Sequence, residues 1–167
     1  MKITKTITLL LMNTSLLFGG DIVKIERMSM GLAMEVAKRS VEACREKGYW
    51  VSAVVVDRSA NVQVILRDTH AARFTMDIAN QKANLVIMSG LNTEAFVPAR
   101  ADIRNELNNI DGLIMMKGGI AVKSGDTMLG AVGVSGAPGG DIDADCAKKA
   151  LKSLEERLAF AAMSDGD

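Results

Sequence analysis

The chain has 167 residues, of which 49% are hydrophobic, and its 20 basic residues are balanced by 20 acidic ones. This length suffices for one domain that buries a core without disulfide or metal staples. The even charge balance, without a basic stripe, argues against a nucleic-acid partner. Only 4% of the residues are aromatic, so alanine, valine, leucine and methionine must fill the interior.

Residues 1–20 have the order of a secretory signal peptide. Lys2 and Lys5 precede an apolar run at 7–18, which a glycine pair closes. The run is too short for a stable membrane span, and its order of charge, apolar run and small residues is typical of export. Bulky residues near the cleavage position keep an uncleaved anchor or a different start open. We therefore predict a periplasmic or secreted protein, with the cytoplasm as the alternative, and a single mature domain at 21–167.

The first part of that domain alternates between helical and strand patterns. Apolar residues recur at helical spacing over about 21–47, which predicts an amphipathic helix that ends before Gly48. Two valine-rich runs follow at 50–56 and 62–66, separated by a polar turn. Two short apolar runs around such a turn predict a β-hairpin.

The middle of the chain is predicted to be helical. One helical pattern has its apolar residues on one side, namely Met76, Ala79, Ala83, Val86 and Ile87. The following stretch, 92–107, is weaker and contains Pro98, which predicts only a short helix. Residues 113–116 form a short apolar run that we predict as an additional strand.

The last third of the chain predicts a second hairpin and a long helix. Apolar runs at 120–122 and 128–134 flank a glycine-containing turn, and a proline and two glycines end the second run. A helical pattern then covers about 141–162, with Asp141 or Asp143 as its predicted N-terminal cap. Tight turns between strands, with the helices in separate blocks, predict an α+β fold with an antiparallel sheet of about five strands flanked by helices.

The two cysteines, Cys44 and Cys146, leave two readings open. No Cys-x-x-Cys motif or Cys/His cluster accompanies them, so a zinc site or a thioredoxin-like redox motif is not supported. Both lie on or near the apolar faces of the first and last predicted helices. They therefore form a disulfide in an exported protein or remain buried free thiols, and we slightly favour the thiols because sequence supplies no geometry.

Three sequence blocks carry a resemblance. They are VVVDRSAN at 54–61, RDTHAARFTMDIANQKA at 67–83, and the glycine-rich run at 118–136, which an acidic helix start follows. In content and order they resemble the GlcG/HbpS family, often called haem-degrading domains and related to the C-terminal domain of PduO-type proteins. The chain departs from the family at His70, where glycine is common, and at Ala121, where proline is frequent. The resemblance implies an antiparallel sheet flanked by helices, homo-oligomeric assembly and, in some members, binding of haem or a corrinoid.

The candidate ligand site combines one imidazole, three basic side chains and a glycine pair. Its members are His70, Arg67, Arg73, Lys82, Gly118 and Gly119. His70 is the single histidine and follows the second predicted strand in a polar loop, where an imidazole can ligate haem iron. The basic groups suit carboxylates such as haem propionates. The alternative is an ordinary surface histidine among solvated charges.

The sequence therefore predicts an exported, homo-oligomeric small-ligand-binding protein whose leading ligand is haem or another tetrapyrrole. One alternative is an enzyme or enzyme accessory that acts on a small organic acid or a corrinoid, with the loop at 136–141 as an anion mouth. Another is a structural assembly module without a ligand. A single histidine and no Ser-His or Cys-His signature favour a non-enzymatic role. No nucleic-acid partner and no stable membrane span are expected.

Overall fold

The computed structural model describes residue 23 and residues 25–164, so the predicted signal peptide lies outside it. In chain order the elements are α1 (Met30–Arg45), β1 (Ser52–Asp57), β2 (Val62–Arg67), α2 (Phe74–Ser89), α3 (Thr93–Ala99), a 3-10 turn (Ala101–Ile103), α4 (Arg104–Asn108), β3 (Gly119–Ser124), β4 (Thr127–Ser135), α5 (Gly140–Lys152) and α6 (Glu155–Ser164). None of the helices in this part of the chain is long and apolar enough to cross a membrane.

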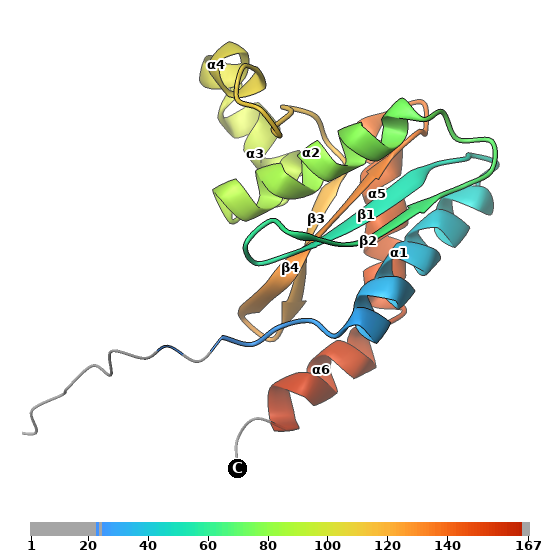
Figure 1. The fold of residues 1–167 in the computed structure, drawn as a ribbon, viewed down its shortest axis with the longest axis vertical. Coiled ribbons are helices and arrows are strands. Elements are labelled where there is room, and N and C mark those ends of the chain that lie inside the picture. The colour runs from blue at the N-terminus through green and yellow to red at the C-terminus, as the bar shows by residue number, and fades with distance from the viewer. Residues whose placement is uncertain (1–22, 24, 165–167) are drawn as a thin grey trace, which may run out of the picture.

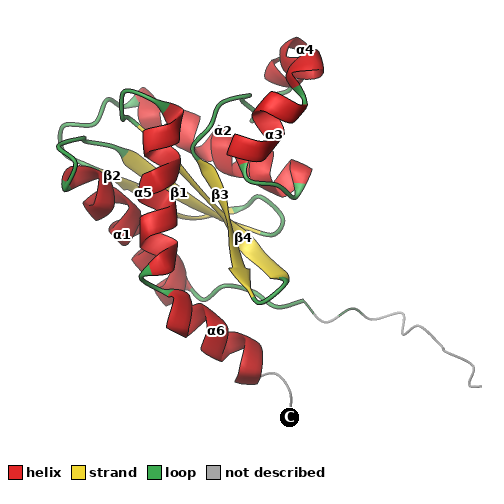
Figure 2. Ribbon diagram, turned by 180° about the vertical axis from the view of Figure 1, so that it is seen from behind, coloured by secondary structure: helices red, strands yellow, loops and turns green. Residues whose placement is uncertain are grey.

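The strands form one antiparallel sheet in the order β2-β1-β4-β3, which confirms the α+β class and both predicted hairpins. α2 lies across one face, and α1 and α5 cover the other (Figure 1). Figure 2 shows α5 running over the strands beside α1. The three layers enclose two apolar cores, one on each face of the sheet, and a third, smaller cluster around Leu85, Phe96 and Met115 packs the region of α3 and α4 against α2.

The sheet has four strands rather than about five, because residues 113–116 do not pair with it. Side chains form hydrogen bonds with the backbone there instead. The Met115 N–H donates to Asn108 Oδ1 at 2.7 Å, and the Met115 carbonyl accepts from Arg104 Nη1 at 2.8 Å. The predicted short helix at 92–107 is likewise divided into α3, the 3-10 turn and α4.

The two faces of the sheet are packed by small and branched side chains. The α2 face buries Val54, Val56, Ala79, Ala83, Val86 and Ala131. α2 lies so close to β4 that a Cβ at Gly133 would overlap the Ala79 carbonyl oxygen. The predicted apolar stripe of this helix is therefore its buried face, although Met76 and Ile87 remain partly exposed.

α1 begins later than predicted because the chain before it is extended. Ser29 caps the helix by accepting a hydrogen bond from the Leu32 N–H at 3.2 Å. Met28 is buried, and its carbonyl accepts from the Gln63 amide at 3.0 Å. Residues 25–28 therefore do not continue the helical pattern.

The predicted last helix is two helices, and its cap differs from the prediction. Arg39 donates to both the carbonyl and the hydroxyl of Ser153, at 3.1 and 3.0 Å, where the chain turns between α5 and α6. The residue at the N-cap of α5 is Gly139, which has no side chain to cap with. Asp141 and Asp143 lie inside the helix and bind other groups, so the predicted aspartate cap is wrong.

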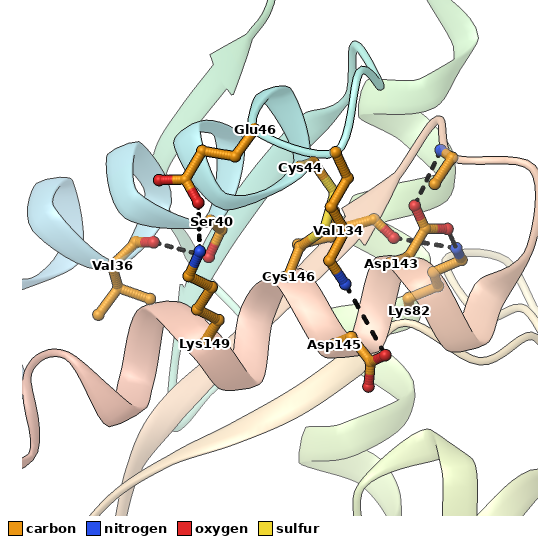
Figure 3. The surroundings of a disulfide bond; sticks show 12 residues. Val36, Ser40, Cys44, Glu46, Lys82, Val134, Asp143, Asp145, Cys146 and Lys149 are labelled. Atoms are coloured by element: carbon orange, nitrogen blue, oxygen red, sulfur yellow. Dashed lines mark hydrogen bonds and ion pairs between the residues drawn. A yellow bond between two sulfur atoms is a disulfide. The ribbon is translucent and has the colours of Figure 1, made fainter.

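Cys44 and Cys146 form a disulfide with a Cα–Cα distance of 5.3 Å, so the favoured reading of free thiols is wrong. The bond joins the end of α1 to the first turns of α5 (Figure 3). The ion pair of Lys149 with Glu46 lies beside it. Sequence could not decide this pairing, because it depends on α1 and α5 lying side by side on the same face of the sheet.

Candidate functional site

The six predicted site residues lie toward one end of the sheet but in two separate groups. The register aligns Ser52 with both Arg67 and Ser135, and Gly119 with Gly133, so β1, β2, β3 and β4 all begin or end here. One group lies beyond β2 and the other at β3. In a sheet ordered β2-β1-β4-β3 these positions are three strand spacings apart, or about 14 Å.

The first group is built on a tight turn that presents His70 to solvent. The Ala71 N–H donates to the Asp68 carbonyl at 3.0 Å, which closes the turn. The Asp68 N–H donates to the Val51 carbonyl at 3.0 Å, which ties the turn to β1. Arg67 Nη1 donates to the Ala71 carbonyl at 2.5 Å, so this predicted ligand-binding arginine also braces the turn.

α1 holds the same turn from the other side. Arg45 Nε donates to Asp68 Oδ2 at 2.9 Å, and the Asp68 side chain is almost fully buried. The hydrogen bond from Arg45 outweighs desolvation and keeps the pKa of the Asp68 carboxyl below its ordinary value. The turn is therefore fixed by β1, by α1 and by its own arginine.

One aromatic ring contacts His70, and a second follows it closely in the chain. Trp50 meets the imidazole edge-on, with ring centroids 5.1 Å apart and an interplanar angle of 70°. Arg73 lies over the Phe74 ring, with the guanidinium carbon 4.6 Å from its centroid. Trp50 is 50% exposed and Phe74 is 63% exposed. We call Trp50, His70, Arg73 and Phe74 the His70 surface.

The second group is centred on a buried ion pair between Lys82 and Asp143. Lys82 Nζ donates to Asp143 Oδ2 at 2.8 Å and to the Val134 carbonyl at 2.9 Å (Figure 3). The Ala137 N–H donates to Asp143 Oδ1 at 3.0 Å. The side chains of Lys82 and Asp143 are only 1% and 3% exposed. Burial raises the pKa of the Asp143 carboxyl, although the Lys82 charge and hydrogen bonds oppose this.

The glycine pair packs directly on this ion pair. Gly118 has φ +120°, and a Cβ there would lie 2.8 Å from Lys82 Nζ and 2.7 Å from the Val134 carbonyl oxygen. The Gly119 N–H donates to Thr93 Oγ1 at 3.0 Å. Lys82, Gly118 and Gly119 therefore come together as a buried brace between α2, β4 and α5, rather than on an open surface with His70.

Two features of the site were missed from the sequence. Asp143 was predicted as a helix cap, yet it is the partner of Lys82. A lysine beside the buried stripe of α2 was the available signal, since a buried ammonium requires an anion. The contact of Trp50 with His70 had no signal in the sequence, because it depends on how β1 and the turn align.

The loop predicted as an anion mouth is already supplied with carboxylates. Asp143 accepts the Ala137 N–H, and Asp141 Oδ1 accepts from Lys117 Nζ at 2.7 Å. Negative charge at this helix start disfavours a bound anion. Among the residues that the structure describes, no cluster of three or more His, Cys, Asp or Glu side chains could hold a metal ion.

This architecture defines a small α+β domain with a four-stranded antiparallel sheet between helical layers. Residues 28–152 match the family model described as haem degrading protein HbpS-like, so the chain belongs to the HbpS-like family, and the resemblance seen in the sequence is confirmed. No functionally curated protein matches the chain.

Solved structures agree with this assignment. A crystal structure of HbpS is 29% identical, with a TM-score of 0.75, and the match covers 81% of this chain and 96% of that one. Protein ORFY of Klebsiella pneumoniae is 25% identical, with a TM-score of 0.74 and coverage of 81% and 96%. A PduOC:heme complex is 21% identical, with a TM-score of 0.67 and coverage of 77% and 95%, and this likeness concerns the fold alone.

Proposed function

We propose that this chain is an exported, homo-oligomeric protein that binds haem or another tetrapyrrole at the His70 surface. The observation that carries the proposal is the exposed imidazole of His70, held on a braced turn in edge-on contact with the half-exposed Trp50 ring. Arg73, stacked over the exposed Phe74 ring, follows three residues later in the chain. Membership of the HbpS-like family supports a haem-related ligand.

The residues present fit such a ligand. A neutral imidazole is a common axial ligand of haem iron, and the exposed Phe74 ring offers flat apolar contact to a porphyrin. Arg73 suits a propionate carboxylate. Because the described residues contain no ready cluster of metal-binding side chains, an iron atom at His70 would need a cofactor to supply its other ligands. Haem supplies four ring nitrogens and a redox-active iron when bound.

We assign the remaining predicted residues to supporting roles. Arg67 braces the turn that carries His70. Lys82, Gly118 and Gly119 hold α2, β4 and α5 together, three strand spacings away. The proposed ligand contacts are therefore His70 and Arg73, with the Phe74 ring.

Export and assembly have separate supports. The disulfide is of the kind that persists in oxidising compartments. Exposed Val62 and Ile65 on the edge strand β2 offer apolar area to a second copy. Sequencing the N-terminus of the secreted protein tests export. The molar mass of the purified protein in light scattering tests homo-oligomeric assembly.

A haemin titration of the purified protein tests ligand binding. We expect a saturable Soret shift in the wild type and its loss or displacement in His70→Ala. Thr69→Ala is the matched control, because Thr69 is exposed on the same turn and its side chain makes no hydrogen bond there. Absence of a saturable shift would overturn haem binding, and a shift unaffected by His70→Ala would overturn the site. A parallel titration with cobalamin separates a corrinoid from haem.

A further inference from the structure

We infer that Trp50 is a positioning residue that holds the His70 imidazole in the orientation used for iron ligation. This inference rests on the proposed function, because it concerns the same site. It starts from the edge-on contact of the two rings, whose centroids are 5.1 Å apart at 70°. Edge-to-face packing of this kind is a preferred arrangement of aromatic rings.

The backbone of Trp50 is fixed independently of His70. The loop after β4 packs against it so closely that a Cβ at Gly136 would lie 2.6 Å from the Trp50 carbonyl oxygen. Val51, the next residue, is fully buried and accepts the Asp68 N–H at 3.0 Å. The indole therefore extends from a rigid position, and half of it remains exposed.

The turn that carries His70 is fixed to the same frame. The hydrogen bond between Asp68 and Val51 sets the distance from the turn to β1. Arg45 and Arg67 hold the turn from α1 and from β2. Two rings that extend from one rigid frame meet in one arrangement, so the imidazole is ordered before any ligand arrives.

Ordering the imidazole in advance has a measurable consequence for affinity. An exposed histidine otherwise samples several rotamers and loses that freedom when it ligates a metal. If the imidazole is already ordered in the free protein, this entropic cost is avoided, and the affinity for haem is higher by about twofold to tenfold. Trp50 itself is not part of either apolar core, so its effect on ligation can be separated from folding.

The single histidine and the single tryptophan make the inference testable without a ligand. In proton NMR spectra of the ligand-free protein we expect the His70 ring protons to be shifted by the indole ring current. The shift should persist in Trp50→Phe and disappear in Trp50→Leu. His70 ring protons at the positions of a free histidine in the wild type would overturn the inference.

Haemin titrations of the same variants test ligation. We expect Trp50→Leu to weaken binding by about twofold to tenfold and to reduce the low-spin fraction, with Trp50→Phe close to the wild type. In a His70→Ala background, Trp50→Leu should have no further effect. An equal loss in that background would show that the indole contacts the ligand directly, which overturns the positioning role.

The two proposals fail in different ways. A haemin spectrum that does not depend on His70 refutes the proposed site, and it also refutes ligation positioned by Trp50. A His70-dependent spectrum that is the same in Trp50→Leu and the wild type refutes only the positioning role. Far-UV circular dichroism of each variant shows whether the fold is retained.

Discussion

The buried pair of Lys82 and Asp143 predicts an unusual pattern of stability in three variants. Lys82→Met leaves a buried carboxylate whose remaining partner is the Ala137 N–H, and Asp143→Leu leaves a buried ammonium with only the Val134 carbonyl. Either single change breaks a pair that is at most 3% exposed. Removing one partner of a buried pair costs about 3–5 kcal/mol of unfolding free energy.

The double variant Lys82→Met/Asp143→Leu should be more stable than either single variant. Apolar replacement of a whole buried pair is often neutral or stabilising, because neither charge then has to be desolvated. The Ala137 N–H still loses its acceptor, which costs about 1–3 kcal/mol. We therefore expect the double variant within about 2 kcal/mol of the wild type, and each single variant further below it.

Thermal and urea unfolding followed by circular dichroism at pH 7 measure these differences. For a chain of 167 residues, each kcal/mol shifts the melting temperature by about 2–4 °C, so each single variant should melt roughly 10 °C lower. If a single variant loses less than about 1 kcal/mol of unfolding free energy, Lys82 and Asp143 do not form a buried ion pair. A double variant whose loss equals the sum of the two single losses would show that the residues are not coupled.

Three further predictions follow from the fold. Reducing the α1–α5 disulfide, whose cysteines are 102 residues apart, should lower the unfolding free energy by about 4.7 kcal/mol in urea titrations, and a double-serine variant should not respond to reductant. Gly133→Ala should cost about 3 kcal/mol or more, because its methyl group would overlap the Ala79 carbonyl. In Gly31→Ala, on the exposed first turn of α1, the nearest atom to the new Cβ is 4.0 Å away, so this control should not lower the melting temperature. The ionised Asp68 carboxylate stabilises the fold through Arg45, which lowers its pKa, and this stabilisation is complete above the ordinary carboxyl pKa. It should be lost as the pH falls below about 4 and Asp68 is protonated. In acid melts, an Arg45→Met variant should therefore lose less stability than the wild type.

Much of the fold could be predicted from the sequence because its signals are local. Short apolar runs around polar or glycine-containing turns predicted both hairpins, and the apolar stripe of α2 predicted its buried face. The errors lie where non-local contacts replace a local pattern. Arg39 reaches Ser153 between α5 and α6, and side chains bind the backbone of Met115 where a strand was predicted.

The candidate site was only partly predictable for the same reason. The exposure of His70 could be predicted because it lies in a polar loop after a strand. Its contact with Trp50 could not, because that contact depends on the alignment of β1 with the turn. The sequence pattern predicted Lys82 in one site with His70, but the structure packs it against Gly118 and Gly119, and its burial depends on Asp143 in α5. The three-dimensional packing thus separates the exposed His70 from the buried Lys82, a distinction that the sequence did not make.

The two edges of the sheet differ in a way that limits how copies can join. At β3, Thr93 and Asn92 bind the outward N–H groups of Gly119 and Ala121, at 3.0 and 2.8 Å. A neighbouring strand would have to displace both side chains, whereas β2 at the opposite edge pairs, within the described part of the chain, with β1 alone. Edge pairing between copies can then use β2 against β2, a two-fold contact that closes on itself. Head-to-tail growth of a continuous sheet, the geometry of a fibre, is blocked at β3.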